Sequence, residues 1–309
     1  MRAQVADVEI CKDILRVVLE GAPELQARTP LDALAELRAN HDAFRRFLLE
    51  PPHGHADVNA CLLLPAMEVG AQNCLVVAAQ FGYAPVAGTM VMAACAALSE
   101  TKEIAHDTGG TLCFDTAAGR QRVTRRDLTG EHPQTVWQTS RPRLCETDAL
   151  LSVGGRAVRV SLVHSGMAYV VVAARDLAIS MQDHVALSQA GRAVVAAARE
   201  AFALKDYGLQ GLVETYLVMV VGDIDRQGAR PTVDVAWVSG SGLVANSAGG
   251  TGALAVAAHL QSLGALETGE VLVTQAPGGP FECTLLDDHA EVAGYPRLLG
   301  IRTLQDGSF

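Results

Sequence analysis

Hydrophobic and polar residues follow two patterns along the chain, one typical of helices and one typical of strands. Apolar residues recur at three- and four-residue spacing over 30–50 and 183–204, which predicts two amphipathic helices. Short runs rich in Val and Leu, bounded by Gly, Pro or polar residues, predict strands. These runs cover 59–67, 72–80, 157–165, 167–174, 217–225, 232–240 and 270–277. The mixture predicts an α+β protein.

An internal repeat links the two halves of the chain. Residues 88–98 read GTMVMAACAAL and residues 250–260 read GTGALAVAAHL, with five of eleven positions identical. Each segment is apolar enough for a helix buried on all sides, and each begins at a Gly-Thr pair. Two copies of one unit predict two pseudo-symmetric domains, in which strands surround a buried helix. The alternative is that two Ala-rich helices resemble one another by composition alone.

A polar, Pro-containing stretch over 125–147 predicts the domain boundary just after it. We therefore expect an N-terminal domain over 1–147, to which 294–309 returns, and a C-terminal domain over 148–293.

Charge and composition narrow the choice of partners. The formal net charge is -10 and Lys and Arg form no cluster, which argues against a nucleic acid or an anionic membrane as partner. The first residues lack the order of a signal peptide and no apolar run is long enough for a membrane span, so a cytoplasmic protein is expected. The expected partner is a small molecule, and the oligomeric state stays open, with a homodimer as one option.

The sequence predicts no metal and no cofactor. Seven scattered cysteines without a C-x-x-C pair fit neither a disulfide framework nor a zinc site. His53 and His55 form an H-x-H pair, but no further cluster of His or Cys supplies metal ligands.

The two Gly-Thr pairs, Gly88-Thr89 and Gly250-Thr251, could bind an anion. A helix N-terminus leaves backbone N–H groups unpaired and carries the positive end of the helix dipole. Glycine lets a ligand approach the backbone closely, and a threonine hydroxyl can add a hydrogen bond. Two such turns facing one another across a domain cleft would hold one small carboxylate from both sides. Alternatively, the pairs only begin two core helices.

Several segments resemble the proline racemase family, in the same order and at similar spacing. EPPHGHADVNACLLLP (50–65) and FGYAPVAGTMVMAA (81–94) are similar to its first motifs. HSGMAYVVV (164–172), NSAGGTGALAVAAHL (246–260) and the segment over 263–285 are similar to its later ones. The resemblance implies a diaminopimelate-epimerase-like fold, with two similar domains and the ligand between two helix N-termini.

Members of this family racemise proline or epimerise hydroxyproline with two cysteines, one at the start of each helix, and a related branch that lacks one cysteine dehydrates trans-3-hydroxyproline. One thiol removes the Cα proton and the other returns a proton to the opposite face. Ala87 stands at the first of these positions and Gly249 at the second. Neither residue can carry a proton, so ordinary proline racemase activity is not expected.

Other positions also depart from the family pattern. Thr89 replaces a histidine, and Ala245 and Asn246 replace an Asp-Arg pair whose aspartate binds the substrate amine. Ala168 replaces a phenylalanine of the pocket wall, and His164 replaces a tyrosine. The loss of bulk predicts a pocket for a ligand larger than proline.

Two hypotheses remain open. The chain is either a thiol-free isomerase, lyase or cyclase acting on a small carboxylate or carbonyl compound, or a non-catalytic ligand-binding homologue. In the first case His55, Asp57 or His164 would act as the base. The expected ligand-binding residues are Gly88, Thr89, Asn246, Ser247, Gly249, Gly250 and Thr251. The expected pocket wall is formed by Tyr83 and Ala168.

Overall fold

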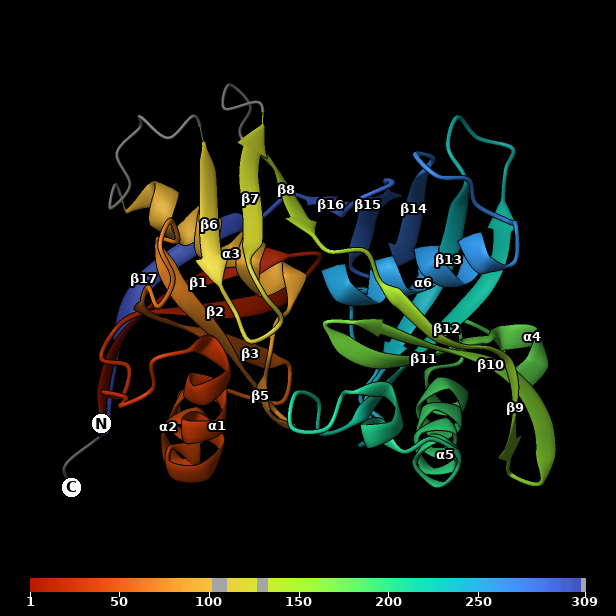
Figure 1. The fold of residues 1–309 in the computed structure, drawn as a ribbon, viewed down its shortest axis with the longest axis horizontal. Coiled ribbons are helices and arrows are strands. Elements are labelled where there is room, and N and C mark those ends of the chain that lie inside the picture. The colour runs from red at the N-terminus through yellow and green to blue at the C-terminus, as the bar shows by residue number, and fades with distance from the viewer. Residues whose placement is uncertain (102–109, 127–132, 307–309) are drawn as a thin grey trace. The chain divides into compact units, whose positions relative to one another are not determined.

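The chain folds into two compact units. The structure, a computed structural model, describes residues 1–101, 110–126 and 133–306 (Figure 1). One unit comprises Met1–Thr139 with Ala293–Phe309, and the other comprises Ser140–Val292. The division at Ser140 lies within the polar stretch over 125–147, and the strands on either side of it pair within different units.

Strands and three helices form the first unit. Its helices are α1 (Pro30–Asn40), α2 (Asp42–Leu49) and α3 (Gly88–Glu100). Its strands are β1 (Arg2–Ile10), β2 (Asp13–Glu20), β3 (Val58–Pro65), β4 (Asn73–Ala79), β5 (Gly82–Ala84), β6 (Thr111–Asp115), β7 (Gln121–Arg126), β8 (Gln134–Thr139) and β17 (Arg297–Gln305). The single helix predicted over 30–50 is two helices, because His41 leaves helical geometry at φ -125° and ψ 26°.

The second unit has the same kinds of element. Its helices are α4 (Ala174–Leu177), α5 (His184–Ala201), the short 3₁₀ helix η2 (Leu204–Tyr207) and α6 (Gly250–Ser262). Its strands are β9 (Arg143–Val153), β10 (Arg156–Ser165), β11 (Met167–Ala173), β12 (Tyr216–Asp225), β13 (Thr232–Val238), β14 (Val271–Ala276) and β15 (Gly279–Leu285), after which β16 (Ala290–Gly294) leads back to the first unit.

The two units share one order of connections. In the first unit an antiparallel pair, β1 and β2, is followed by α1 and α2 and then by β3, which runs parallel to β2. In the second unit β10 and β11 pair in the same way, and α4 and α5 lead to β12, which runs parallel to β11. Further along the chain, α3 connects β4 and β5 to β6, which pairs with β4 in parallel. In the second unit α6 connects β13 to β14, which pairs with β13 in parallel. The repeated helix thus occupies the same topological position in both units.

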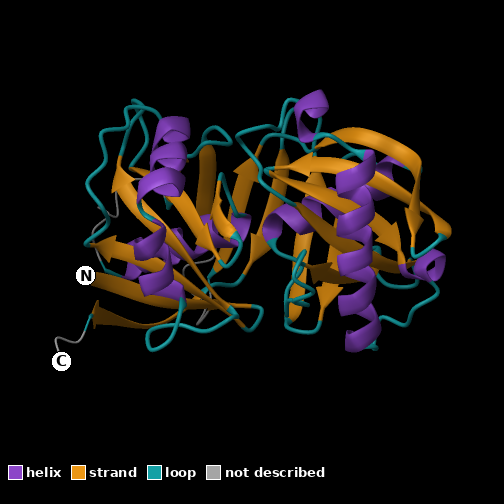
Figure 2. Ribbon diagram, turned by 90° about the horizontal axis from the view of Figure 1, so that it is seen from below, coloured by secondary structure: helices purple, strands orange, loops and turns teal. Residues whose placement is uncertain are grey.

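Both repeated helices are central. In α3 every residue from Gly88 to Leu98 is buried, and α6 is buried over most of its length. The other helices cover the outer face of the strands, as α5 does in the second unit (Figure 2). On β13, Val238 packs against Gly191 of α5 while the neighbouring Trp237 lies beside Gly252 of α6. Adjacent strand residues point to opposite faces, so α5 and α6 cover opposite faces of these strands.

Candidate ligand site at the starts of the central helices

The two central helices begin without a side-chain cap. By contrast, the Thr29 side chain accepts a hydrogen bond from the backbone of α1, and Asp183 accepts two from α5. At the N-cap positions of α3 and α6 stand Ala87 and Gly249, neither of which makes a side-chain cap hydrogen bond. The shorter helices α2 and α4 also lack such a cap. What distinguishes α3 and α6 is that their first three residues are buried, and a buried helix start without an acceptor for its N–H groups is unusual.

At the start of α3 the backbone has the geometry of an N-cap, but no side chain fills that role. Ala87 has φ -141° and ψ 126°, the extended geometry of N-cap residues, but its methyl group cannot accept a hydrogen bond. Thr89 is 8 % exposed, and its hydroxyl makes no hydrogen bond to any described residue. This turn therefore offers backbone N–H groups and one unused hydroxyl.

Trp137 packs against the first turn of α3. A Cβ added to Gly88 would lie 2.3 Å from Cε3 of the Trp137 ring, so only glycine fits there. The indole N–H donates to Oε1 of Gln121, whose amide in turn donates to the Gly119 carbonyl. Gln121 thus holds the ring that sets the position of the helix start.

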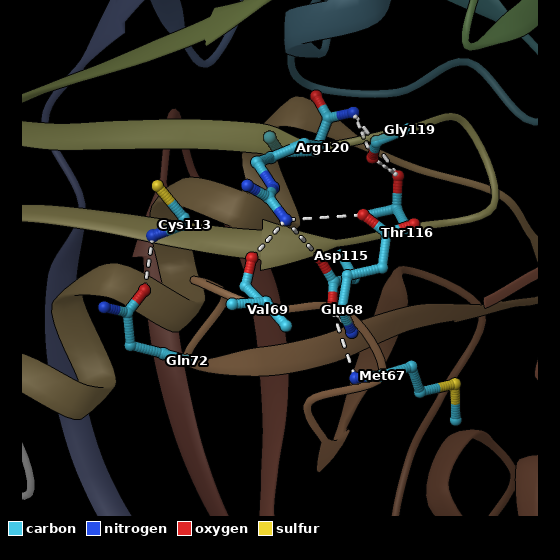
Figure 3. Close-up of polar contacts among 10 residues, drawn as sticks. Met67, Glu68, Val69, Gln72, Cys113, Asp115, Thr116, Gly119 and Arg120 are labelled. Atoms are coloured by element: carbon cyan, nitrogen blue, oxygen red, sulfur yellow. Dashed lines mark hydrogen bonds and ion pairs between the residues drawn. The ribbon is translucent and has the colours of Figure 1, made fainter. Parts of the chain in front are cut away.

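Gln121 belongs to a hairpin that is itself fixed by a buried carboxylate (Figure 3). Oδ2 of Asp115 accepts from the backbone N–H of Met67 and of Glu68, at 3.2 and 2.8 Å. Arg120 lies 3.8 Å from the other carboxylate oxygen and donates to the Val69 carbonyl. These contacts fasten the β6–β7 turn to the loop between β3 and β4. The residues that hold Trp137 against α3 are therefore themselves fixed by a third segment of the chain.

The start of α6 has a different backbone. Gly249 has φ 64° and ψ 151°, a conformation almost restricted to glycine. An added Cβ would meet no atom within 4 Å, so the space beside the Gly249 backbone is open. The Gly249 N–H donates to the Ser247 hydroxyl, and the Asn246 carbonyl accepts from the Gly278 N–H. Asn246 is exposed, whereas Ser247 is buried.

Three side chains meet at the first turn of α6. The Tyr169 and Thr251 hydroxyl oxygens are 2.7 Å apart, and the Trp237 ring lies beside the same turn. Burial raises the pKa of Tyr169, and the neighbouring Thr251 and Trp237 side chains lower it. Tyr169 and the two tryptophans were not among the predicted site residues. Their only sequence signals are that the chain has just two tryptophans and that Tyr169 interrupts an aliphatic run.

Tyr83, predicted to line the pocket, belongs to the core instead. Its side chain is 2 % exposed and lies in the hydrophobic cluster that α1 and α2 form with β3 and β4. Its hydroxyl donates to the His41 carbonyl, and its own carbonyl accepts from Arg38. Tyr83 therefore stabilises the packing of α1 and α2, and its role as a pocket wall stays a prediction.

Ala168 and His164 lie on the wrong face of the strands for a site at α6. Tyr169 points to α6, so the adjacent Ala168 points to the opposite face. His164 is the direct partner of Ala168 across the β10–β11 pair and shares that face. Ala168 is fully buried, and its role as a pocket wall stays a prediction. Burial, and to a lesser degree Arg143, lower the pKa of His164.

His55 and Asp57 lie on the surface of the first unit. Their side chains are 57 % and 61 % exposed, and Nδ1 of His55 is 3.8 Å from Oδ2 of Asp57. His53 is held differently: its ring lies edge-on to Phe47 and its carbonyl accepts from the buried Arg16. His53 is therefore structural, and the roles of His55 and Asp57 as bases stay predictions.

The four buried cysteines lie away from the two helix starts. Cys95 lies in the middle of α3, where burial raises its pKa to about 11. Burial also raises the pKa of Cys61, Cys74 and Cys283, which are buried in strands. A neutral thiol is a poor base and nucleophile. Within the described ranges, no group of three or more His, Cys, Asp or Glu residues is placed to hold a metal, and no helix has the length and apolar character to span a membrane.

Two similar strand-rich units, each with a central helix that begins open, define the class as a racemase- or epimerase-type fold. The chain belongs to the proline racemase family, whose family model matches residues 5–302. A 4-hydroxyproline epimerase from Brucella suis is 23% identical over 303 residues, covering 95% of this chain and 88% of the relative.

Solved structures show the same fold. A probable proline racemase from Agrobacterium radiobacter, crystallised with bound carbonate, has a TM-score of 0.88 at 21% identity and covers 99% of this chain and 93% of its own. A hydroxyproline epimerase from Agrobacterium vitis, crystallised with trans-4-hydroxy-L-proline, has a TM-score of 0.81 at 22% identity, with 98% and 92% covered. The α+β, epimerase-like fold predicted from the sequence is confirmed.

Proposed function

We propose that the protein binds a small carboxylate, or a related carbonyl compound, at the open N-termini of α3 and α6, and that it does so without thiol chemistry. The observation that carries this proposal is that both central helices begin buried and without a side-chain cap, whereas α1 and α5 have side-chain caps and the uncapped starts of α2 and α4 are more exposed. A ligand oxygen would supply the missing acceptor. The carbonate bound to one structural relative and the carboxylate of the hydroxyproline bound to the other both present anionic oxygens.

The ligand is proposed to be bulkier than proline. Support now comes from Gly249, where the space beside the backbone is open, and from the half-buried Ala87, rather than from Ala168.

Binding is the better supported role, because neither helix start carries a group that titrates near neutral pH. One observation favours catalysis as the second candidate: the His55–Asp57 pair is exposed and could supply a base. The reaction would then be an isomerisation, dehydration or cyclisation in which backbone N–H groups stabilise a developing oxyanion.

The substitution Ala87→Asp tests the proposal. An aspartate at an N-cap position accepts hydrogen bonds from the first turn and would compete with the ligand. We expect the variant to be more stable by about 0.5–2 kcal/mol and to lose carboxylate binding at α3. Amide NMR titrations with acetate, benzoate, L-proline and trans-4-hydroxy-L-proline would follow the signals of Gly88, Thr89, Gly250 and Thr251.

The wild-type protein should bind at least one of these probes at roughly millimolar affinity, typical of about 4 kcal/mol of net binding free energy. If saturating carboxylate moves none of the four signals, the helix starts are not ligand sites. If Ala87→Asp binds the probes as tightly as wild type, the missing cap of α3 has no role in binding. Deuterium exchange at the Cα of proline, measured in heavy water, should not exceed the buffer rate.

A further inference from the structure

A cavity lies in the second unit where α5 ends and the chain leads through η2 to β12. It measures about 400 Å³, which is within the size range of small-molecule sites. Its lining includes Phe202 at the end of α5 and Tyr216 at the start of β12, both of which are buried. Tyr216 is the direct partner of Ala168 across β11 and β12 and shares its face, which points away from α6. The cavity is therefore distinct from the start of α6.

Hydrogen bonds and ring contacts hold the aromatic part of the lining in place. The Tyr216 hydroxyl donates to the Phe202 carbonyl at 2.7 Å, which joins the end of α5 to β12. The Phe202 ring lies edge-on to Tyr207 of η2, with the ring centroids 6.2 Å apart. The Tyr207 hydroxyl donates in turn to Glu146 of β9 at 2.8 Å. Because several elements fix these aromatic side chains, the apolar part of the cavity is preformed, which lowers the cost of binding a ligand.

Two cations line the same cavity, Arg199 of α5 and Lys205 of η2. Neither forms an ion pair with any residue that the structure describes, although the chain carries a formal net charge of -10. The Arg199 guanidinium donates to the Thr215 hydroxyl at 3.2 Å, and its remaining N–H groups donate to none of the described residues. Of the lining residues only Glu214 is acidic, and it has an interaction of its own. The lining therefore carries an excess of positive charge, which attracts an anion.

We propose that this cavity is a second ligand site, which binds a phosphate monoester that carries an apolar or aromatic group. Arg199 and Lys205 bind the phosphate, and the apolar group packs against Phe202, Leu204 and Tyr216. A phosphate monoester carries a charge of about -1.5 to -2 at neutral pH, more than a carboxylate, so two cations favour it over a carboxylate of the same shape. This site goes beyond the carboxylate binding proposed at α3 and α6 and does not depend on it.

NMR titration of the whole chain with phenyl phosphate tests the inference. Phenyl phosphate should shift the amide signals of Lys205, Thr215 and Tyr216 with roughly millimolar affinity, and benzoate should bind there more weakly. Arg199→Gln and Lys205→Gln should each weaken phenyl phosphate binding about two- to fivefold, because ion pairs of exposed side chains are weak. The matched control is Arg192→Gln, which removes an exposed arginine of α5 outside the cavity and should leave the affinity unchanged.

Inorganic phosphate separates the contribution of the phosphate from that of the apolar group. It should shift the same three signals but bind more weakly than phenyl phosphate. Leu204→Ala should weaken phenyl phosphate binding about two- to fivefold, because apolar contact is lost, and should leave inorganic phosphate binding unchanged.

Three outcomes would overturn the inference. Phenyl phosphate could shift none of the three signals, or a folded variant that combines Arg199→Gln with Lys205→Gln could keep wild-type affinity. Benzoate could also bind at these signals as tightly as phenyl phosphate. The amide signals of Gly88 and Gly250 report the helix starts separately, so a failure of the proposed function is distinguishable from a failure at this cavity.

Discussion

Gly249 offers a direct test of whether the backbone at the start of α6 accepts only glycine. The substitution Gly249→Ala adds one methyl group where no atom lies within 4 Å, so it creates no clash. Its cost would come from the backbone alone, because φ 64° with ψ 151° is almost inaccessible to residues with a Cβ. The substitution therefore isolates conformational strain from packing.

The expected loss of stability follows from two opposing terms. A side chain held in this region costs about 1–3 kcal/mol. Alanine also reduces the conformational freedom of the unfolded chain, which returns about 0.4–1 kcal/mol. The net loss should be about 1–2 kcal/mol, or roughly 2–8 °C in melting temperature for a cooperative unit of this size.

Calorimetry and urea unfolding would measure this loss, with Gly252→Ala as the control. At Gly252 the added Cβ would meet the sulfur of Met219 at 2.9 Å, so the control changes packing in the same turn without a positive φ. If Gly249→Ala is as stable as wild type, the turn can relax to an ordinary conformation. The reasoning would then fail, and a cysteine at this position would be structurally admissible.

Three further predictions concern other parts of the structure. Gly88→Ala should destabilise the protein by about 1–3 kcal/mol, because the new Cβ would overlap Trp137, and urea unfolding of Gly88→Ala combined with Trp137→Leu should show partial recovery. Ala87→Cys should place a thiol at a helix N-terminus, where the pKa of the thiol falls below its usual value of about 8.5. Peptide-resolved alkylation near neutral pH should therefore label this cysteine. It should spare Cys95, because burial raises the pKa of Cys95 to about 11. Burial lowers the pKa of His164, so below about pH 6.5 the unfolded chain binds more protons than the folded one. The stability of the protein should therefore fall as the pH drops below about 6.5. In urea unfolding midpoints measured against pH, His164→Phe should make this fall less steep.

The sequence predicted the central helices well because their signal is local. Both begin at the Gly-Thr pair, at Gly88 and Gly250, and end two residues beyond the repeated segment. The strands at the two ends of the chain were not predicted. In β17 nearly every residue is exposed, so its apolar and polar positions carry no period of two that a pattern could reveal.

The candidate site was predicted only in part, and strand register explains the limit. The backbone positions at the helix starts follow from the repeat, but the choice between Ala168 and Tyr169 depends on which face of β11 meets α6. A shift of one residue in the strand register moves each side chain to the opposite face of the sheet. Because Met167–Val172 is buried on both faces, its sequence does not indicate which side chains point to α6. The partnership of Tyr169 with Thr251 joins residues far apart in sequence, which no local pattern reveals.

The placement of the two tryptophans gives each unit its own optical reporter. Trp137 is 1 % exposed and lies against the start of α3, and Trp237 is more accessible and lies beside the start of α6. Their fluorescence should therefore differ in emission wavelength and in access to quenchers. Replacing either by phenylalanine leaves a single emitter, so that the unfolding of one unit, and a ligand's arrival at one helix, can be observed separately from the other.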